Sequence, residues 1–71
     1  MDKKPENIAF GNRVANIRRK KAMSQEALAL ECGINRTYIG EIERGEKTPS
    51  LITIVRIAEG LKISKSELMN Y

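Results

Sequence analysis

The sequence predicts an all-α fold, a compact five-helix bundle in one domain. Apolar residues recur at spacings of three and four in five segments, as on one face of a helix, and polar cap residues precede most of these segments. No stretch alternates apolar and polar residues for long enough to indicate a sheet. The 71 residues suffice for a single core, which we expect within residues 6–71 after a flexible arm at residues 1–5.

The first helix is expected from about residue 7 to residue 21. Pro5 and Ile8 mark its start, because proline is favoured in the first turn of a helix. The face predicted to be buried carries Phe10, Val14 and Ile17.

Two short helices follow, separated only by residues 32–35. Ser24 is the expected N-cap of the first, with Met23 before the cap packing on Leu28. Its buried residues are predicted to be Leu28, Ala29 and Cys32. Gly33 tolerates the positive φ needed where the chain reverses, and Asn35 starts the next helix as its N-cap. This spacing predicts a helix-turn-helix, a unit whose second helix enters a groove of DNA.

The third helix is expected to run from the Asn35 cap until Gly45. Ile34 packs on Ile39 across the cap, and Ile39 and Ile42 face the core. The opposite, solvent-facing side carries Arg36, Thr37, Gly40, Glu41 and Arg44. This helix therefore offers hydrogen-bonding side chains on its outer face.

The last two helices complete the predicted core. Ser50 is expected to start the fourth helix, whose buried stripe is Leu51, Ile54, Ile57, Ala58 and Leu61. Ser64 and Glu67 have the spacing of a capping box at the start of the fifth helix, and Ile63 and Leu68 flank this cap as an apolar pair.

Composition limits the possible functions. The chain has no His and one Cys, so it predicts no disulfide, no metal site, no cofactor and no catalytic constellation, and an enzyme is not expected. No apolar run approaches the roughly 20 residues of a membrane span, and we expect a cytoplasmic protein without a small-molecule ligand. The net charge is +4, with seven Lys or Arg against two acids in residues 1–22. This basic third indicates a phosphate-contacting surface, although residues 18–21 also suit a solvated helix end.

Several segments resemble one known family. They are residues 10–14 (FGNRV), 17–18 (IR), 24–29 (SQEALA), 39–45 (IGEIERG) and 49–51 (PSL). The chain resembles the Cro/repressor-type helix-turn-helix transcription regulators, also called the xenobiotic response element family. The Arg-Thr-Tyr-Ile opening at residue 36 and the chain length are most similar to the controller proteins of restriction-modification systems. Phage regulators and antitoxin-like repressors share the same frame.

Three residues of the third helix match the family's base-reading positions. Arg36 could bridge guanine O6 and N7, Thr37 could contact a thymine methyl group, and Glu41 could accept a hydrogen bond from cytosine N4. A carboxylate facing DNA phosphates is repelled unless it meets a donor, so Glu41 favours selective binding. The alternative for Glu41 is an outward charge paired with Arg44 or Lys47.

Further residues are predicted to contact the DNA backbone. They are Gln25, Asn35, Tyr38, Arg44, Lys47, Arg19, Lys20 and Lys21. Gln25 matches the family's phosphate-contacting position, at a helix N-terminus whose free amides attract anions. The alternatives are capping alone for Asn35, packing for Tyr38, and a solvated surface for the others.

The resemblance also implies an ion pair between Arg18 and Glu43, with the structural role of tying the first helix to the third. The chain departs from the family pattern at two positions. Ala27 replaces a common capping Glu, and Glu46 places a negative charge in a loop near the expected path of DNA.

A homodimer is expected, because one such domain reads about half of a pseudo-palindromic operator. The predicted dimer interface consists of Ile52, Val55, Leu68, Met69 and Tyr71. The alternative is that some of these residues complete the core.

The sequence thus predicts a regulator that binds specific double-stranded DNA, as repressor or activator, with RNA polymerase as a further candidate partner. One rival class is a protein-interaction module, including an antitoxin-like repressor that binds a protein partner through the same fold. Another is a nonspecific binder of nucleic acid or anionic membranes, driven by the basic first third.

Overall fold

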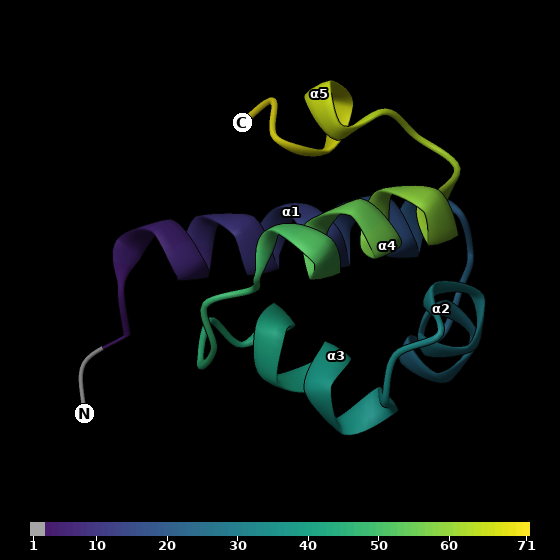
Figure 1. Cartoon of the computed structure of the whole chain (residues 1–71), viewed down its shortest axis with the longest axis horizontal. Helices are drawn as coiled ribbons and strands as arrows, with labels where there is room; N and C mark the ends of the chain where they lie inside the picture. Colours follow the sequence, from purple (N-terminus) through teal and green to yellow (C-terminus); the bar gives the residue numbers. More distant parts are fainter. Residues whose placement is uncertain (1–2) are drawn as a thin grey trace.

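The computed structural model describes residues 3–71, and its regular structure in this part of the chain is entirely helical (Figure 1). The helices are α1 (Pro5–Lys20), α2 (Gln25–Cys32), α3 (Arg36–Glu43), α4 (Leu51–Leu61) and α5 (Lys65–Leu68). The predicted all-α, five-helix fold is therefore confirmed.

The first helix begins at Pro5, two residues earlier than predicted. Lys4 is its extended N-cap, and the φ that proline imposes suits the first helical position. The expected flexible arm at residues 1–5 therefore overlaps the helix at Pro5. Its first two residues, Met1 and Asp2, lie outside the described residues.

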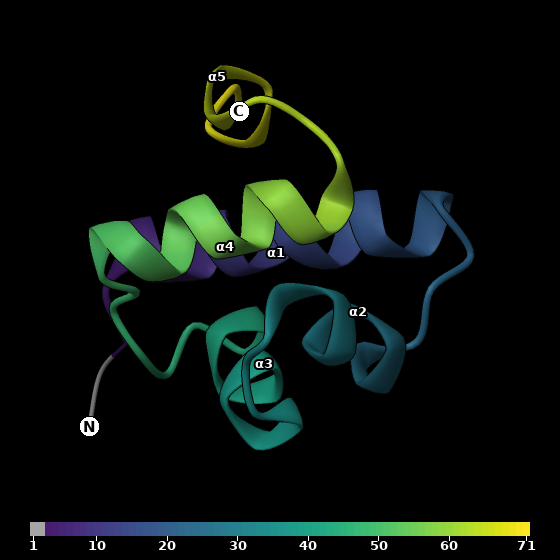
Figure 2. The ribbon, with the colours of Figure 1, turned by 45° about the vertical axis from the view of Figure 1, so that its right-hand side comes forward.

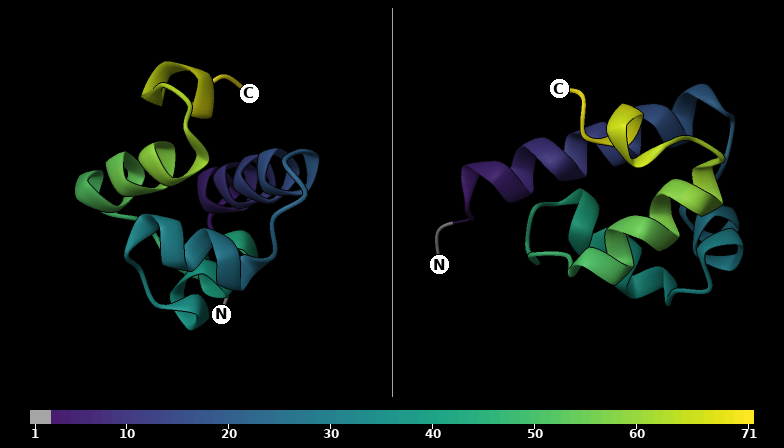
Figure 3. Two further views of the ribbon diagram at one scale, coloured as in Figure 1. Left: turned by 90° about the vertical axis from the view of Figure 1, so that its right-hand side faces the viewer. Right: turned by 45° about the horizontal axis from the view of Figure 1, so that its top comes forward.

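The helices form three levels. Helices α1 and α4 lie side by side in the middle, α2 and α3 lie on one side of them, and α5 lies on the other (Figure 2 and the left panel of Figure 3). Helix α2 packs against α3 and α4, α1 packs against α3 and α4, and α5 packs against α4. The outer surface of α3 and the C-terminal segment are thus on opposite sides of the molecule.

The core lies where these levels meet. Its buried residues are Phe10, Val14, Ile17, Leu28, Ala29, Cys32, Ile39, Ile42, Ile57, Ala58, Leu61 and Leu68. The prediction was wrong for Leu51, which is 76% exposed, and Thr53 is buried instead. Leu51 is the first residue of α4, at the edge of its buried face, whereas Thr53 lies about 40° from Ile57 around the helix axis and so faces the core.

Side-chain caps fix where four helices begin. The side-chain oxygens of Ser24, Asn35, Ser50 and Ser64 accept hydrogen bonds from the backbone amides of Ala27, Thr37, Thr53 and Glu67. Gly33 adopts a φ of 66°, as its predicted turn requires. Because α2 and α3 are joined through this turn and its Asn35 cap, the start of α3 is set by local chemistry.

Cys32 is a packing residue between α2 and α4. A side chain at Gly60 would meet Cys32 Sγ, so the absence of one lets the two helices approach closely. Burial, with a smaller effect of Glu31, raises the pKa of the Cys32 thiol to about 11. The thiol is thus protonated and uncharged at neutral pH, as suits a core residue.

Candidate nucleic-acid interface

Helix α3 has one buried side and one exposed side. Ile39 and Ile42 are buried as predicted, whereas Arg36 and Thr37 are exposed and Glu41 is half-buried. Gly40 was wrongly placed on the outer face: it is buried, because the side chains of Arg44 and Gln25 lie beside it. The three predicted base-reading residues therefore lie on one helix, with the first two open to solvent at its N-terminal end.

A fork of hydrogen bonds anchors the other end of α3. Arg18 Nε donates to Glu43 Oε2 at 2.7 Å and Arg18 Nη2 donates to Glu43 Oε1 at 2.9 Å. Arg18 Nη1 also donates to the Met23 carbonyl at 2.8 Å. The hydrogen bond with Glu43 is the main cause that raises the pKa of Arg18. One guanidinium thus joins α1, the segment before α2, and α3.

Gln25 takes part in this anchor. The half-buried side chain donates from Nε2 to Glu43 Oε1 at 3.0 Å. The sequence assigned Gln25 to a DNA phosphate, but one Nε2 hydrogen is thus used within the protein. An amide nitrogen carries two hydrogens, so the second could donate to a phosphate from a fixed position.

Asn35 and Tyr38 have structural roles at the start of α3. Asn35 Oδ1 accepts from the Thr37 amide at 2.7 Å, while the exposed side chain keeps its amide nitrogen for another acceptor. Tyr38 is half-buried and packs against the core. Both structural alternatives raised for these residues therefore operate, and a role on DNA would be additional.

The side chain of Arg44 forms two hydrogen bonds with the carboxylate of Glu46. We call this pair the Arg44–Glu46 fork. Arg44 Nε donates to Glu46 Oε2 at 2.7 Å and Nη2 donates to Oε1 at 3.2 Å. The alternative that pairs Glu41 with Arg44 holds only at longer range: the Glu41 charge contributes to raising the pKa of Arg44, but the hydrogen bonds go to Glu46. The chain turns back at Gly45, where φ is 76°, and the Glu46 amide bonds to the Glu41 carbonyl. This reversal brings Glu46 over the end of α3.

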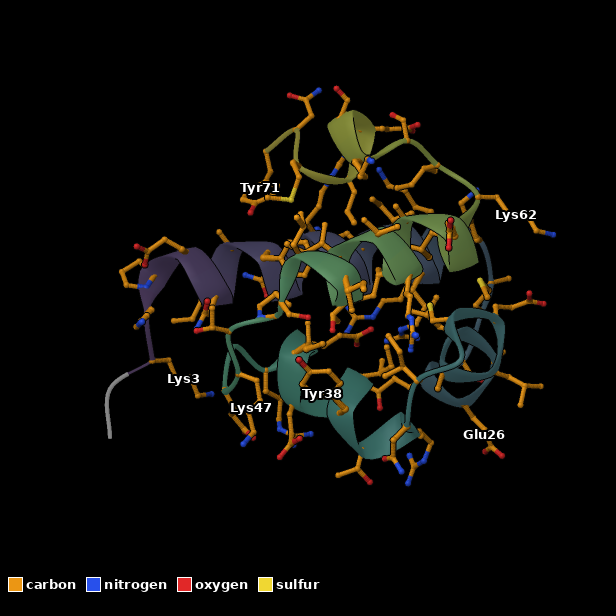
Figure 4. The ribbon with its side chains drawn as sticks, viewed as in Figure 1. Lys3, Glu26, Tyr38, Lys47, Lys62 and Tyr71 are labelled. Carbon is orange, nitrogen blue, oxygen red and sulfur yellow. The ribbon has the colours of Figure 1, made fainter. Side chains whose placement is uncertain are left out.

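The structure also adds Lys3 to the basic residues near α3. Lys3 and Lys47 lie on the α3 side of the molecule, whereas Lys62 and Tyr71 lie on the other side (Figure 4). Both lysines are close enough to Glu46 to contribute to lowering the pKa of its carboxyl group, although Arg44 is the main cause. Nothing in the local sequence around Lys3 indicates this position.

Arg19, Lys20 and Lys21, the predicted phosphate-contacting residues at the end of α1, do not all lie beside the exposed face of α3. Arg19 and Lys20 are exposed in the last turn of α1, where cations also favour the helix dipole. Lys21 lines a shallow hollow with Gly60 and Lys62 at the end of α4. Lys21 is thus separated from the exposed face of α3.

The predicted dimer residues are mostly at the surface. Ile52, Met69 and Tyr71 are exposed and Val55 is half-buried. Leu68 is fully buried, so its assignment to the interface was wrong. It follows the Ser64 cap by four residues and enters the core, as the apolar pair around that cap also predicted.

Metal-ligand clusters and membrane-spanning helices are absent from residues 3–71. No three His, Cys, Asp or Glu side chains come together there as metal ligands. No helix of this region combines the length and the apolar character needed to span a membrane.

A helix-turn-helix whose second helix is anchored by the Arg18–Glu43 pair and exposes Arg36 and Thr37 to solvent is the architecture of a DNA-binding transcription regulator. The chain belongs to the helix-turn-helix family, whose model matches residues 14–68.

Three similar proteins support the assignment of the chain to this family. Control protein C.BamHI of Bacillus amyloliquefaciens is 43% identical over 65 residues, which cover 90% of this chain and 80% of the relative. Among solved structures, the restriction-modification controller protein C.AhdI from Aeromonas hydrophila matches with a TM-score of 0.89 at 38% identity, covering 92% of this chain and 98% of that one. The wild-type controller protein C.Esp1396I matches with a TM-score of 0.87 at 29% identity, covering 92% and 84% of the two chains.

Proposed function

We propose that this protein is a restriction-modification controller that binds a specific double-stranded DNA operator as a homodimer. The observation that carries the proposal is the exposed N-terminal end of α3, where Arg36 and Thr37 project from a helix that Arg18 and Glu43 hold in place. The names of the relatives C.BamHI and C.AhdI support the biological role. The protein would act in the cytoplasm, without a cofactor and without catalysis.

Sequence recognition would come from the outer face of α3. Arg36 would bond the O6 and N7 atoms of a guanine, Thr37 would contact a thymine methyl group, and Glu41 would accept from a cytosine amine. Asn35, Lys47 and Lys3 would contact phosphates and set the depth of α3 in the groove. Bound protein would either block a promoter or contact RNA polymerase, depending on where the operator lies.

Replacing Arg36 with alanine is expected to weaken binding to the operator by about 10- to 100-fold for each protomer of the dimer, because one bidentate base contact contributes about 1 to 3 kcal/mol. Binding to unrelated duplexes would fall much less. The operator would first be selected from random duplexes, and affinities would then be measured by fluorescence anisotropy at fixed salt. Arg56→Ala is the matched control, since it removes the same charge from an exposed position on α4.

Two results would contradict this assignment. Shuffled duplexes could compete as well as the selected one, which would indicate nonspecific binding. Alternatively, Arg36→Ala and Arg56→Ala could weaken operator binding equally, which would remove Arg36 from base recognition.

The proposed dimer interface consists of Ile52, Val55, Met69 and Tyr71. A two-fold arrangement would place two α3 helices about one DNA turn apart, roughly 34 Å, so that each reads half of the operator. The exposed apolar side chains of Ile52, Met69 and Tyr71 would then be covered by the second copy.

The double variant Ile52→Asp, Met69→Asp is expected to be a folded monomer with weakened operator binding, because each new carboxylate would be buried against the other copy. Sedimentation equilibrium would measure the mass, and circular dichroism would verify the helices. Leu30→Asp is the control, since Leu30 is also exposed but lies on α2, outside the proposed interface on α4 and α5. A double variant with the mass of the wild type would exclude this interface.

A further inference from the structure

Glu46 occupies a position surrounded by positive charge. Both of its carboxylate oxygens accept hydrogen bonds from Arg44, at 2.7 and 3.2 Å, in the Arg44–Glu46 fork. The positive charges of Lys3, far before Glu46 in the sequence, and of Lys47, directly after it, also act on the Glu46 carboxylate. The Glu46 carboxylate therefore neutralises the Arg44 guanidinium at the end of α3.

The Arg44 side chain lies across α3 toward the start of α2. A Cβ atom built on Gly40 would be 3.1 Å from Arg44 Nη1 and 3.6 Å from Gln25 Oε1. The missing side chain at Gly40 thus leaves the space that the guanidinium occupies. The ends of the Arg44 and Gln25 side chains thus both border the space beside Gly40.

A carboxylate and a phosphate offer a guanidinium the same pair of oxygen acceptors. Arg44 makes its two bonds with Glu46 along one edge of the guanidinium, so the same edge cannot bind a phosphate until the fork opens. Both side chains are substantially exposed, at 55% for Arg44 and 37% for Glu46, so opening the fork requires no change in the core.

We propose that Glu46 acts as an internal substitute for a DNA phosphate, and that it keeps the affinity of each protomer for DNA below what Arg44 would otherwise provide. The inference rests on the proposed function, because it assumes that the α3 face meets DNA. Glu46 thereby sets how strongly the protein binds DNA without reading any base.

The test combines Glu46→Gln with Arg44→Gln, singly and together, on the selected operator and on an unrelated duplex. Glu46→Gln is expected to tighten binding to both duplexes by about two- to fivefold for each protomer, in the range of an exposed ion pair. The slope of log affinity against log salt should steepen by about 0.9 for each protomer, as for one added phosphate contact. In the double variant, the gain from Glu46→Gln should disappear.

Glu31→Gln is the matched control, since it removes an equal charge from an exposed position on α2 and should change affinity much less. If Glu46→Gln tightens binding equally with and without Arg44, Glu46 only repels DNA and the inference is overturned. It is also overturned if Glu46→Gln leaves affinity unchanged or lowers it, because the fork would then have no effect or would position Arg44 for DNA.

Retention on immobilised heparin separates this inference from the proposed function. Heparin is a polyanion without base sequence, and Glu46→Gln should elute at higher salt than the wild type only when Arg44 is present. Failure of the proposed function would instead appear as equal affinity of the wild type for the operator and the unrelated duplex, whatever the effect of Glu46.

Discussion

Replacing Gly11 with alanine is expected to destabilise the protein by about 3 kcal/mol or more, at the upper end of the cost of overpacking. The Cβ atom would overlap the Ile42 carbonyl oxygen and would lie 2.8 Å from the Glu43 carbonyl oxygen. These are backbone atoms of α3, so no flexible side chain can move aside. A single core in a domain of this size supplies only about 3 to 5 kcal/mol, so the variant should be largely unfolded or have a displaced α3.

Urea denaturation followed by circular dichroism measures this loss. Gly33→Ala is the control, because an added Cβ there meets nothing within 4 Å and the cost comes only from its φ of 66°. That cost should be about 1 kcal/mol. If Gly11→Ala unfolds at the same urea concentration as Gly33→Ala, the close approach of α1 to α3 is not as the structure has it.

Features set by neighbouring residues were predictable from the sequence. The Ser24 and Asn35 caps and the positive φ of Gly33 each depend on a few consecutive residues, so local chemistry defined α2, α3 and the turn between them. The outward position of Thr37 followed from the helical period once the inward Ile39 and Ile42 were identified.

Features set by distant residues were not predictable in the same way. Leu51 is exposed although it was expected to be buried, and Thr53 is buried, because the direction in which α4 meets the rest of the bundle decides its buried face. Glu46 reaches Arg44 only after the chain turns at Gly45, and Lys3 comes near that pair through the packing of α1 on α3. In these cases the periodicity of a single segment does not predict which residues are buried or which side chains come into contact.

Replacing Glu43 with glutamine is expected to destabilise the fold by about 3 kcal/mol and to weaken operator binding. Arg18 and Glu43 have side chains only 11% and 5% exposed, so removing one charge leaves the other without its partner in a region that excludes water. Arg18 would keep the bond to the Met23 carbonyl, which cannot balance a full charge. Since Glu43 ends α3, its loss should also loosen the helix that carries Arg36.

The double variant Arg18→Met, Glu43→Leu separates stability from orientation. Both charges are then absent, so we expect urea denaturation to show stability much closer to the wild type, as found for apolar replacements of buried ion pairs. Operator affinity should stay reduced, because apolar contacts do not reproduce the directional bonds from Arg18 and Gln25 that hold Glu43. If operator affinity returns together with stability, the ion pair has no positioning role. If the double variant is as unstable as Glu43→Gln, the loss comes from missing hydrogen bonds and packing rather than from an unpaired charge.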